Sequence, residues 1–325
     1  MYPRITDLFS DLFGFDFPIP LYSFGLMVAT AILTATWLAR RELDRMYNAG
    51  LVGAVEVKEQ GKNGRTKIVK TSPSAIMWNV MLMAGFFGIV GSKLFHIIDY
   101  WERFVLDPMG YLFSSGGLTF YGGLITAGVA IWLYARSKGL RFGPLADAIA
   151  PGLILGYGIG RIGCYLSGDG DWGVCSNLAD KPGWIPGFLW SETFPRNFLK
   201  VDVVADTAAK MERNGLSAAD CVGATGVYPT MLYEFAMAVV IFGILWALRK
   251  HTHQAGWLFA LYLVFNGIER FLIETVRLNP LLSWIDLSQA QFIAILLVVV
   301  GAAGMALTWK RRTPMPEPIP EPVEA

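Results

Sequence analysis

One arginine of this 325-residue chain stands where an apolar run gives way to a loop of glycine and aspartate. Arg161 lies within the run 157–166, and the loop 167–173 that follows reads SGDGDWG. An arginine at the edge of hydrocarbon is costly unless an anion or a polar cavity accepts it. Because a guanidinium holds a phosphate through two parallel hydrogen bonds, Arg161 is a candidate anion-binding residue. The alternative is a side chain that reaches towards the membrane surface only to stay hydrated.

Glycines surround this arginine on the predicted helix. They occupy positions 156, 158, 160 and 163 and leave one side of the helix without side chains. Another backbone or a lipid headgroup can therefore approach that side closely.

A later apolar run carries charged residues at helical spacing. Arginines beside carboxylates on one helix face would form a pocket for an anionic headgroup, most simply a phosphate. The alternative is that the carboxylates, among them Glu269, only neutralise buried arginines. The face has i, i+4, i+8 and i+11 spacing and comprises Asn266, Arg270, Glu274 and Arg277.

Two other apolar runs add phenol and carboxylate groups. Tyr233 and Glu234 lie early in the run 227–249, and Tyr121 lies near the start of an earlier run. The glycine pair 122–123 follows Tyr121 and would leave room for a headgroup beside its phenol. The commoner role for such tyrosines is to anchor a helix at the membrane interface.

The composition is that of an integral membrane protein. Hydrophobic residues make up 54% of the chain and charged residues only 16%, against about 25% in soluble domains. Three cysteines without CxxC spacing form no metal or redox motif, and we expect no cofactor, no metal and no nucleic-acid partner. Seven apolar runs are long enough to span about 30 Å of hydrocarbon: 19–40, 75–97, 117–136, 144–166, 227–249, 255–277 and 288–309.

The charge of the connections predicts the orientation of these runs. The loops after the first, third and fifth runs and the C-terminal end carry an excess of lysine and arginine, whereas the loop after the second run is acidic on balance. Because positive loops stay in the cytoplasm, we expect the N-terminus outside and the C-terminus in the cytoplasm. This topology brings the polar residues of five helices to a similar depth near the outer leaflet.

The organisation predicted from these features is one transmembrane domain, residues 1–312, followed by a disordered Pro/Glu-rich cytoplasmic tail, residues 313–325. The domain includes a cytoplasmic loop, residues 41–74. Two short segments of this loop flank Asn63-Gly64, a pair typical of tight turns, and they predict a small hairpin.

The connection 167–226 is the longest between apolar runs and is rich in glycine, proline and aspartate. It is too long for a bare loop, so it predicts a small cap outside the membrane. Cys175 and Cys221 both fall within it. An oxidising compartment would allow them to form a disulfide.

Four motifs of the chain resemble those of one family. They are GGLTFYGGLI from Gly116, ADAIAPGLILGYGIGRIG from Ala146, YPTMLYE from Tyr228 and RFLIETVR from Arg270. In order and helix position they are similar to the prolipoprotein diacylglyceryl transferases, and the resemblance covers most of the chain. The GRxG element with its acidic loop is the most specific part.

The resemblance implies an all-α integral membrane protein of the bacterial inner membrane, with seven transmembrane helices and a periplasmic cap between helices 4 and 5. It implies an active site that faces the periplasmic leaflet. The implied reaction moves the diacylglyceryl group of phosphatidylglycerol to the lipobox cysteine thiol of a prolipoprotein. It forms a thioether, releases glycerol phosphate and is the first step of bacterial lipoprotein maturation.

The resemblance also assigns roles to residues. Arg161 and Gly173 match the arginine and the closing glycine of the family's signature motif, and Glu234 matches the end of its HPxxLYE element. The predicted catalytic residues are Tyr121, Arg161 and Arg270. The predicted substrate-binding residues are Arg161, Asp169, Asp171, Gly173, Tyr233, Glu234, Asn266, Arg270, Glu274 and Arg277.

Several positions depart from the family pattern. Tyr121 and Tyr228 stand where the family has histidines, and Cys164 replaces the asparagine of GRxGN. Asn266 replaces a tyrosine, Lys93 replaces an arginine, and the acidic loop is one residue longer than usual. These substitutions remove the histidines from the key positions and keep the arginines that would face phosphate.

The implied reaction needs a thiol that loses its proton, a glycerol carbon in line with the thiolate, and a stabilised phosphate leaving group. Arg161 and Arg270 would stabilise the phosphate, and Arg277 would steer the headgroup at the rim. We expect Tyr121 to take the proton, provided that neighbouring arginines make its phenol more acidic. Asp169 or Asp171 is the alternative base.

Two other functions fit part of the pattern. Glycine-rich helices with buried arginines also suit a divergent paralogue that binds or moves a phospholipid or a small anion without transfer. Against this, the polar groups gather near one leaflet rather than at the midplane, and the sequence shows no inverted repeat. A transferase with a different acceptor or donor is the third interpretation. Attachment of labelled diacylglycerol to a lipobox peptide would separate them.

Overall fold

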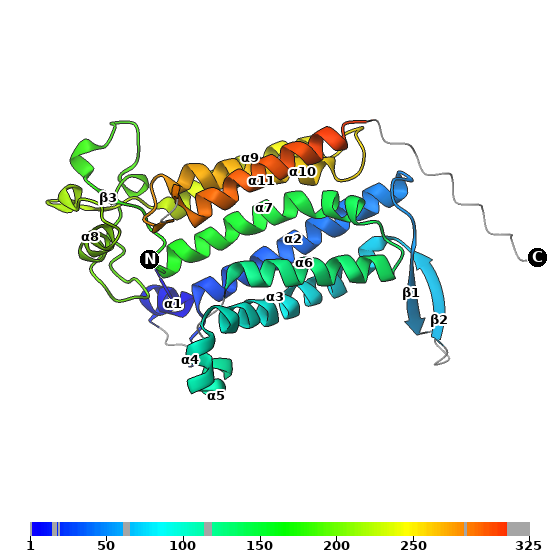
Figure 1. Ribbon diagram of the computed structural model, residues 1–325, viewed down its shortest axis with the longest axis horizontal. Helices are drawn as coiled ribbons and strands as arrows, with labels where there is room; N and C mark the ends of the chain where they lie inside the picture. The colour runs from blue at the N-terminus through cyan, green and yellow to red at the C-terminus, as the bar shows by residue number, and fades with distance from the viewer. Residues whose placement is uncertain are drawn as a thin grey trace, which may run out of the picture. The chain divides into compact units, whose positions relative to one another are not determined.

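The computed structural model describes residues 2–14, 18, 20–60, 66–113, 119–282 and 285–310 (Figure 1). The chain forms two compact units, one built from Met1–Ala35 with Ala150–Arg311 and the other from Thr36–Ile149. The predicted tail 313–325 lies outside the described residues.

Each of the seven predicted apolar runs overlaps one long helix within the described part of the chain. These helices are α2 (Ser23–Asn48), α3 (Met77–Asp99), α6 (Phe120–Ser137), α7 (Phe142–Ser167), α9 (Thr230–Leu248), α10 (Trp257–Glu274) and α11 (Gln289–Leu307). The shorter helices are α1 (Ile5–Phe13), α4 (Trp101–Leu106), α5 (Pro108–Phe113) and α8 (Val203–Arg213), with 3₁₀ turns η1 (Pro73–Ile76), η2 (Leu178–Asp180), η3 (Gly187–Leu189) and η4 (Ala219–Cys221).

Five helices of the described chain are long and apolar enough to cross a membrane: α2, α3 with its preceding turn η1, α7, α9 and α11. The remaining two long helices are α6 and α10. Helix α10 has only 18 residues and carries Glu269, Arg270 and Glu274 among them, which is more charge than an ordinary span holds. The fold is that of a mostly helical membrane protein.

The unit built from Thr36–Ile149 contains the predicted hairpin. Strand β1 (Val55–Gln60) pairs antiparallel with β2 (Thr66–Thr71), and Val57 lies opposite Val69. This confirms the hairpin predicted within loop 41–74, although the turn at Asn63-Gly64 lies outside the described residues. Val55 is buried with Leu43 of α2, so the hairpin is fixed to the apolar core of its unit.

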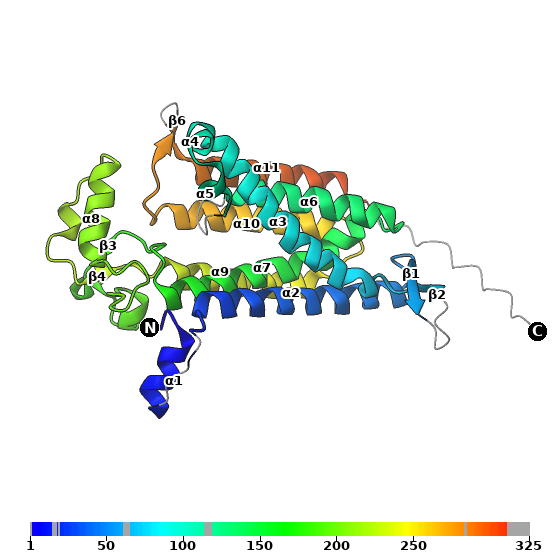
Figure 2. The same cartoon turned by 90° about the horizontal axis from the view of Figure 1, so that it is seen from below.

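Helices α3 and α6 of this unit lie side by side (Figures 1 and 2). A Cβ atom at Gly122 would lie 2.4 Å from the Cβ atom of Phe95, and one at Gly123 would lie 2.6 Å from the carbonyl oxygen of Gly88. The glycine pair therefore serves close helix packing. The expectation that it leaves room for a headgroup beside Tyr121 is wrong, because α3 already fills that space.

In the other unit, α10 packs against both α9 and α11. The contact with α11 depends on glycine: a Cβ atom at Gly301 would lie 2.7 Å from the carbonyl oxygen of Ala260 and 2.8 Å from Val264 Cγ2. Backbone approach of this kind is how helices associate where no hydrophobic effect drives them together.

Gly301→Ala is expected to lower the free energy of unfolding by about 1–3 kcal/mol, because the new methyl group overpacks the α10–α11 contact. The measurement is thermal unfolding of the purified protein in detergent. Gly243→Ala is the matched control, since a Cβ atom at Gly243 in α9 would meet no atom within 4 Å. Equal melting temperatures for the two variants would show that the α10–α11 approach is not tight.

The segment between α7 and α9 is folded. Strand β3 (Cys175–Ser176) pairs antiparallel with β4 (Gly226–Val227), and Trp172 and Phe194 are buried in one apolar cluster with Val227. A disulfide joins Cys175 to Cys221, which confirms the predicted pairing. After α10, β5 (Leu281–Leu282) and β6 (Ile285–Ser288) form a short antiparallel pair that leads into α11.

Candidate active site

Three helix ends position the predicted site in the unit that contains α9 and α10. Arg161 lies nearly two turns before the end of α7, Glu234 in the second turn of α9, and Arg270 one turn before the end of α10. These ends lie together beside the segment that carries α8 (Figures 1 and 2). Helix α9 begins at Thr230, directly after Pro229, and Thr230 Oγ1 donates a 2.6 Å hydrogen bond to the Asp171 carbonyl, which ties the loop after α7 to the start of α9.

Glu234 is the centre of the site and has an exposed fraction of 0%. Its Oε2 atom lies 3.2 Å from Arg161 Nε. Its Oε1 atom lies 3.5 Å from Arg270 Nη1 and 3.5 Å from Arg277 Nη1. A buried carboxylate needs such counter-charges, because burial without them would neutralise it. We call Arg161, Arg270 and Arg277 the arginine cluster.

Asp171 joins two members of the arginine cluster from the loop after α7. Its Oδ2 atom accepts a 2.6 Å hydrogen bond from Arg161 Nη1, and its Oδ1 atom accepts one of 2.7 Å from Arg277 Nη2. Burial alone would raise the pKa of Asp171, but the guanidiniums of Arg277 and Arg161 outweigh burial and hold that pKa below its usual value. Asp171 is therefore a structural anion and a poor base.

Arg277 reaches the cluster differently from the sequence prediction. Helix α10 ends at Glu274, so Arg277 does not share a helix face with Asn266, Arg270 and Glu274, and that prediction is wrong for this residue. Arg277 instead forms a β-bridge with Gly173, next to a 3.0 Å hydrogen bond from Val174 N to Val276 O. A Cβ atom at Gly173 would lie 2.9 Å from the Val276 oxygen, so only glycine allows this approach.

Glu274 holds Arg270 from the far side. Arg270 Nη2 lies 3.0 Å from Glu274 Oε2. The other oxygen of Glu274 accepts hydrogen bonds from Asn279 Nδ2, at 2.5 Å, and from Ser288 Oγ, at 2.7 Å. These bonds fix the carboxylate and, through it, the direction of the arginine.

The arginine cluster keeps unused hydrogen-bonding capacity. The three guanidiniums carry three positive charges, and Asp171, Glu234 and Glu274 carry three negative charges. Even so, one nitrogen of each arginine contacts Glu234 only as an ion pair, at 3.2–3.5 Å, without an aligned hydrogen bond: Arg161 Nε, Arg270 Nη1 and Arg277 Nη1. These three nitrogens converge on the Glu234 carboxylate, so a phosphate, whose oxygens accept several charge-assisted bonds at once, would have to compete with Glu234 for them.

The glycines beside Arg161 behave largely as predicted. A Cβ atom at Gly158 would lie 2.8 Å from Ala238 Cβ of α9, and one at Gly163 would lie 3.0 Å from Met27 Cβ of α2. Other helices therefore approach this side of α7 closely. Gly160 is different, because a Cβ atom there would meet no atom within 4 Å.

The other predicted site residues take more varied positions. Tyr233 donates a 2.5 Å hydrogen bond from its hydroxyl to the Leu189 carbonyl, which fixes the loop at η3 to α9. Asn266 is half-buried one turn before Arg270 on α10. Tyr121 lies in the first turn of α6, in the other unit, and its place in the active site stays a prediction.

Asp169 differs from Asp171 in its electrostatic setting. Burial raises the pKa of Asp169 above its usual value, and the nearby charge of Asp171 adds to the increase. Its carboxylate is therefore the more basic of the two. Cys164 Sγ and a carboxylate oxygen from each aspartate lie within 4.8 Å of one another. The guanidiniums already bound to Asp171 make this group unfavourable for a metal cation.

Tyr157 had no role assigned from sequence, and Glu269 was considered only as a counter-charge for buried arginines. The Tyr157 hydroxyl lies 2.7 Å from Glu234 Oε1 and 3.3 Å from Glu269 Oε1. Arg161 lies over the Tyr157 ring, 5.1 Å from its centroid. The available signal was that Tyr157 precedes Arg161 by one helical turn and that Glu269 adjoins Arg270.

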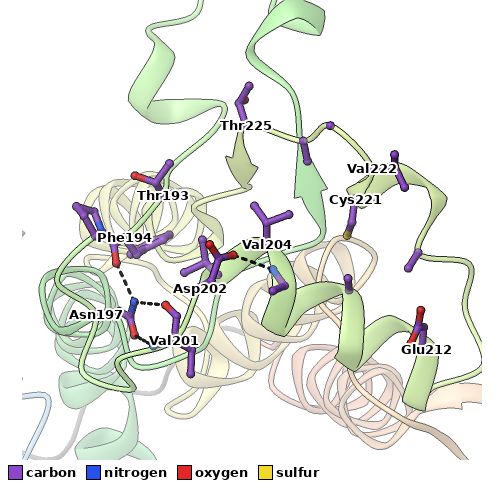
Figure 3. A pocket seen from close by; sticks show the side chains of 17 residues that line it. Thr193, Phe194, Asn197, Val201, Asp202, Val204, Glu212, Cys221, Val222 and Thr225 are labelled. Atoms are coloured by element: carbon purple, nitrogen blue, oxygen red, sulfur yellow. Dashed lines mark hydrogen bonds between the residues drawn. The ribbon is translucent and has the colours of Figure 1, made fainter.

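A cavity of about 850 Å³ lies away from the arginine cluster, in the segment that carries α8 (Figure 3). Asn197 shapes its rim by donating hydrogen bonds of 2.9 Å to the Phe194 carbonyl and 2.8 Å to the Val201 carbonyl. Val204 and Val222 contribute apolar wall. None of the predicted site residues belongs to the described residues that line it.

Asp171→Asn is expected to lower the melting temperature at neutral pH and to flatten the acid side of the stability–pH curve. A carboxyl whose pKa is lower in the folded state stabilises the fold above its unfolded pKa, about 3.9 for aspartate, and loses this contribution as the pH falls through the folded pKa. Asparagine cannot titrate, so the stability of the Asp171→Asn variant should not show this loss at acid pH. The measurement is thermal unfolding in detergent over an acid-to-neutral pH series.

The matched control is Asp11→Asn. Asp11 also receives a 2.7 Å bond from an arginine, Arg196, but both side chains are exposed. Exposed ion pairs contribute little, so this variant should melt near the wild-type temperature. Equal effects of the two substitutions would contradict the structural role of Asp171.

Comparison of the sequence with known proteins identifies the family of the chain. The family model described as Prolipoprotein diacylglyceryl transferase matches residues 11–307. A protein of Chromohalobacter salexigens named phosphatidylglycerol–prolipoprotein diacylglyceryl transferase is 30% identical over 305 residues, covering 92% of this chain and 91% of the relative. A protein of the same name from Bacillus cereus is 29% identical over 291 residues, covering 87% and 86%. One from Dehalococcoides mccartyi is 31% identical over 214 residues, covering 66% and 70%. The chain therefore belongs to the prolipoprotein diacylglyceryl transferase family.

Proposed function

We propose that this protein transfers the diacylglyceryl group of phosphatidylglycerol to the lipobox cysteine thiol of prolipoproteins. The names of its relatives supply the donor and the kind of acceptor. The observation that carries the proposal is the arginine cluster itself, because guanidiniums from α7, α10 and the segment after α10 converge on one carboxylate, each through a nitrogen that makes an ion pair without an aligned hydrogen bond. A phosphodiester headgroup is the part of the donor that such donors would recognise.

In the proposed reaction, the thiolate sulfur attacks the glycerol carbon that carries the phosphate. A carbon–sulfur bond forms, the carbon–oxygen bond to phosphate breaks, and its electron pair stays on the phosphate oxygen. Arg161 and Arg270 stabilise that developing charge in a site with little water, and Arg277, the least exposed of the three arginine side chains, holds the headgroup beside them rather than at the rim. Products are the thioether-linked prolipoprotein and glycerol phosphate.

The proton of the thiol goes to a base of the protein, and Tyr121 is the proposed base. Of the two alternatives, Asp169 is better suited than Asp171. Burial raises the pKa of Asp169, which makes its carboxylate more basic, whereas Asp171 is engaged by two arginines. If Asp169 is the base, the transfer rate should fall as the pH falls through the raised pKa of Asp169.

The proposed membrane arrangement has seven spans, with α6 and α10 added to the five apolar helices, the N-terminus outside and the C-terminus in the cytoplasm. The segment between α7 and α9 is then the periplasmic cap, and its disulfide suits an oxidising compartment. The same arrangement places the arginine cluster at the periplasmic leaflet of the inner membrane. Accessibility of engineered cysteines to a membrane-impermeant thiol reagent would test it.

The test of the function uses the purified protein in detergent, phosphatidylglycerol labelled in its acyl chains, and a synthetic lipobox peptide. Label should move to the peptide, and a peptide with serine in place of the lipobox cysteine should receive none. If the protein binds the labelled lipid but leaves the peptide unlabelled, it is a lipid-binding or lipid-moving paralogue. Label transfer to the serine peptide would mean a different acceptor chemistry.

A further inference from the structure

Glu234 and Glu269 face the same phenol from two helices. Glu234 has an exposed fraction of 0% and Glu269 of 2%, so water does not hydrate either carboxyl well. Both approach the hydroxyl of Tyr157, at 2.7 Å and 3.3 Å. A phenol has one proton to donate, so it can serve only one carboxylate at a time. Both contacts are hydrogen bonds only if the second carboxyl carries a proton and donates it to the phenol oxygen.

The surrounding charges decide which carboxyl holds that proton. Glu234 lies within 3.5 Å of an N–H nitrogen of every member of the arginine cluster, so three positive charges surround it. The groups that face Glu269 are Tyr157 and Arg161 of α7, Glu234 of α9, and Arg270 and Tyr262 of its own helix. Its Oε2 atom has no hydrogen-bond partner among the described residues. The proton therefore belongs on Glu269.

We infer that Glu269 stores a proton that passes through Tyr157 to Glu234 when the anionic phosphodiester headgroup binds to the arginine cluster. The Tyr157 proton moves to Glu234 Oε1 and the Glu269 proton moves to the Tyr157 oxygen, so no proton enters or leaves the protein. This inference rests on the proposed function only in taking a phosphodiester lipid as the ligand of the cluster.

The charges of the site explain why the transfer would help binding. With Glu234 ionised, three arginines face three carboxylates and the cluster is neutral. An incoming phosphodiester would then add an uncompensated negative charge beside Glu234. The transfer leaves the net charge of the site unchanged and moves one negative charge from Glu234 to Glu269. The three arginines then have only Asp171 and Glu274 as ion-pair partners, and the headgroup can take the place of the Glu234 charge. Two like charges that share a site favour protonation of one of them.

The experiment measures equilibrium binding of radiolabelled phosphatidylglycerol to the purified protein in neutral detergent micelles, without an acceptor peptide, from about pH 6 to pH 8. Wild-type Kd should be independent of pH, because the proton comes from within the protein. Glu269→Gln keeps the shape but has no proton to give, so Glu234 must take one from solvent. Its Kd should rise about tenfold per pH unit.

Tyr157→Phe tests whether the proton passes through the Tyr157 hydroxyl, and it leaves the proton held by Glu269 in place. It leaves the proton count unchanged, so its Kd should stay independent of pH, but the lipid should bind more slowly. Tyr165→Phe is the matched control: Tyr165 lies on the same helix, with its hydroxyl 3.3 Å from Glu192 Oε2, and both its Kd and its binding rate should equal those of the wild type. Glu269→Gln with a pH-independent Kd, or a wild-type Kd that itself rises tenfold per pH unit, would overturn the inference.

An infrared measurement on the wild type keeps the test decisive if Glu269→Gln does not fold. The carbonyl stretch of a protonated, buried carboxylic acid should be present without lipid, and it should shift without losing intensity when phosphatidylglycerol is added. Absence of that band would overturn the inference. None of these measurements depends on diacylglyceryl transfer, so the two proposals can fail separately. If the protein binds the lipid with a pH-independent Kd but leaves the peptide unlabelled, the proton transfer from Glu269 still stands and the proposed transferase activity is contradicted.

Discussion

Arg161→Lys is expected to reduce diacylglyceryl transfer by at least about 100-fold, which is the usual effect of removing one preorganised donor to a developing anion. The guanidinium uses separate nitrogens for Glu234 and Asp171, at 3.2 Å and 2.6 Å. A lysine ammonium is a single point of charge and cannot hold both carboxylates while it donates to a phosphate. The measurement is the initial rate of label transfer from phosphatidylglycerol to the lipobox peptide.

The matched control is Arg196→Lys, which changes an exposed arginine paired with Asp11 and should leave the rate unchanged. Intact folding of the Arg161 variant is checked by its melting temperature and by mapping of the Cys175–Cys221 disulfide. A folded Arg161→Lys protein with a wild-type rate would contradict the two-pronged phosphate contact. Loss of the folded protein would instead support the alternative in which the arginine only balances buried carboxylates.

The long helices could be predicted because each depends on a run of local residues. Apolar length alone marked α9 and α11, and the hairpin β1–β2 followed from a turn pair between alternating segments. The Cys175–Cys221 disulfide was also within reach, since both cysteines fall in one connection. Local signals of this kind do not depend on what the segment packs against.

The errors arise where a distant segment decides the structure. Spacing placed Arg277 on the face of α10, but the helix ends at Glu274, and the Val276 carbonyl accepts a hydrogen bond from Val174, about one hundred residues earlier in the chain. The glycine pair 122–123 likewise shows in sequence that a helix surface is bare. It does not show that α3 covers that surface.

The site was predicted as a set of residues but not as a network. The arginines were recognisable because charge is rare in apolar helices. The role of Tyr157 was not, because it depends on two carboxyls from α9 and α10 that meet its hydroxyl. A tyrosine within an apolar run is usually an ordinary packing or interfacial residue, so its type and position alone could not reveal this contact.

Tyr121→Phe is expected to reduce turnover by roughly 10²–10⁴-fold if the phenol acts as the base or as a hydrogen-bond donor in the reaction. The substitution removes one oxygen and keeps the ring at the start of α6. The measurement is turnover of phosphatidylglycerol and lipobox peptide by the purified variant. Tyr134→Phe is the matched control, because Tyr134 lies on the same helix with its hydroxyl 2.9 Å from Asn79 Nδ2.

Tyr121→His separates a chemical role from a structural one. An imidazole has a pKa of about 6.5, which suits proton transfer near neutral pH, and histidine is the residue that the family pattern carries at this position. If Tyr121 takes the proton, the histidine variant should keep or exceed the wild-type rate while the phenylalanine variant fails. If Tyr121 only anchors the helix end, phenylalanine should be silent. A silent Tyr121→Phe with continued turnover would leave the transferase activity in place and move the proton to Asp169, because Asp171 is already bound by Arg161 and Arg277.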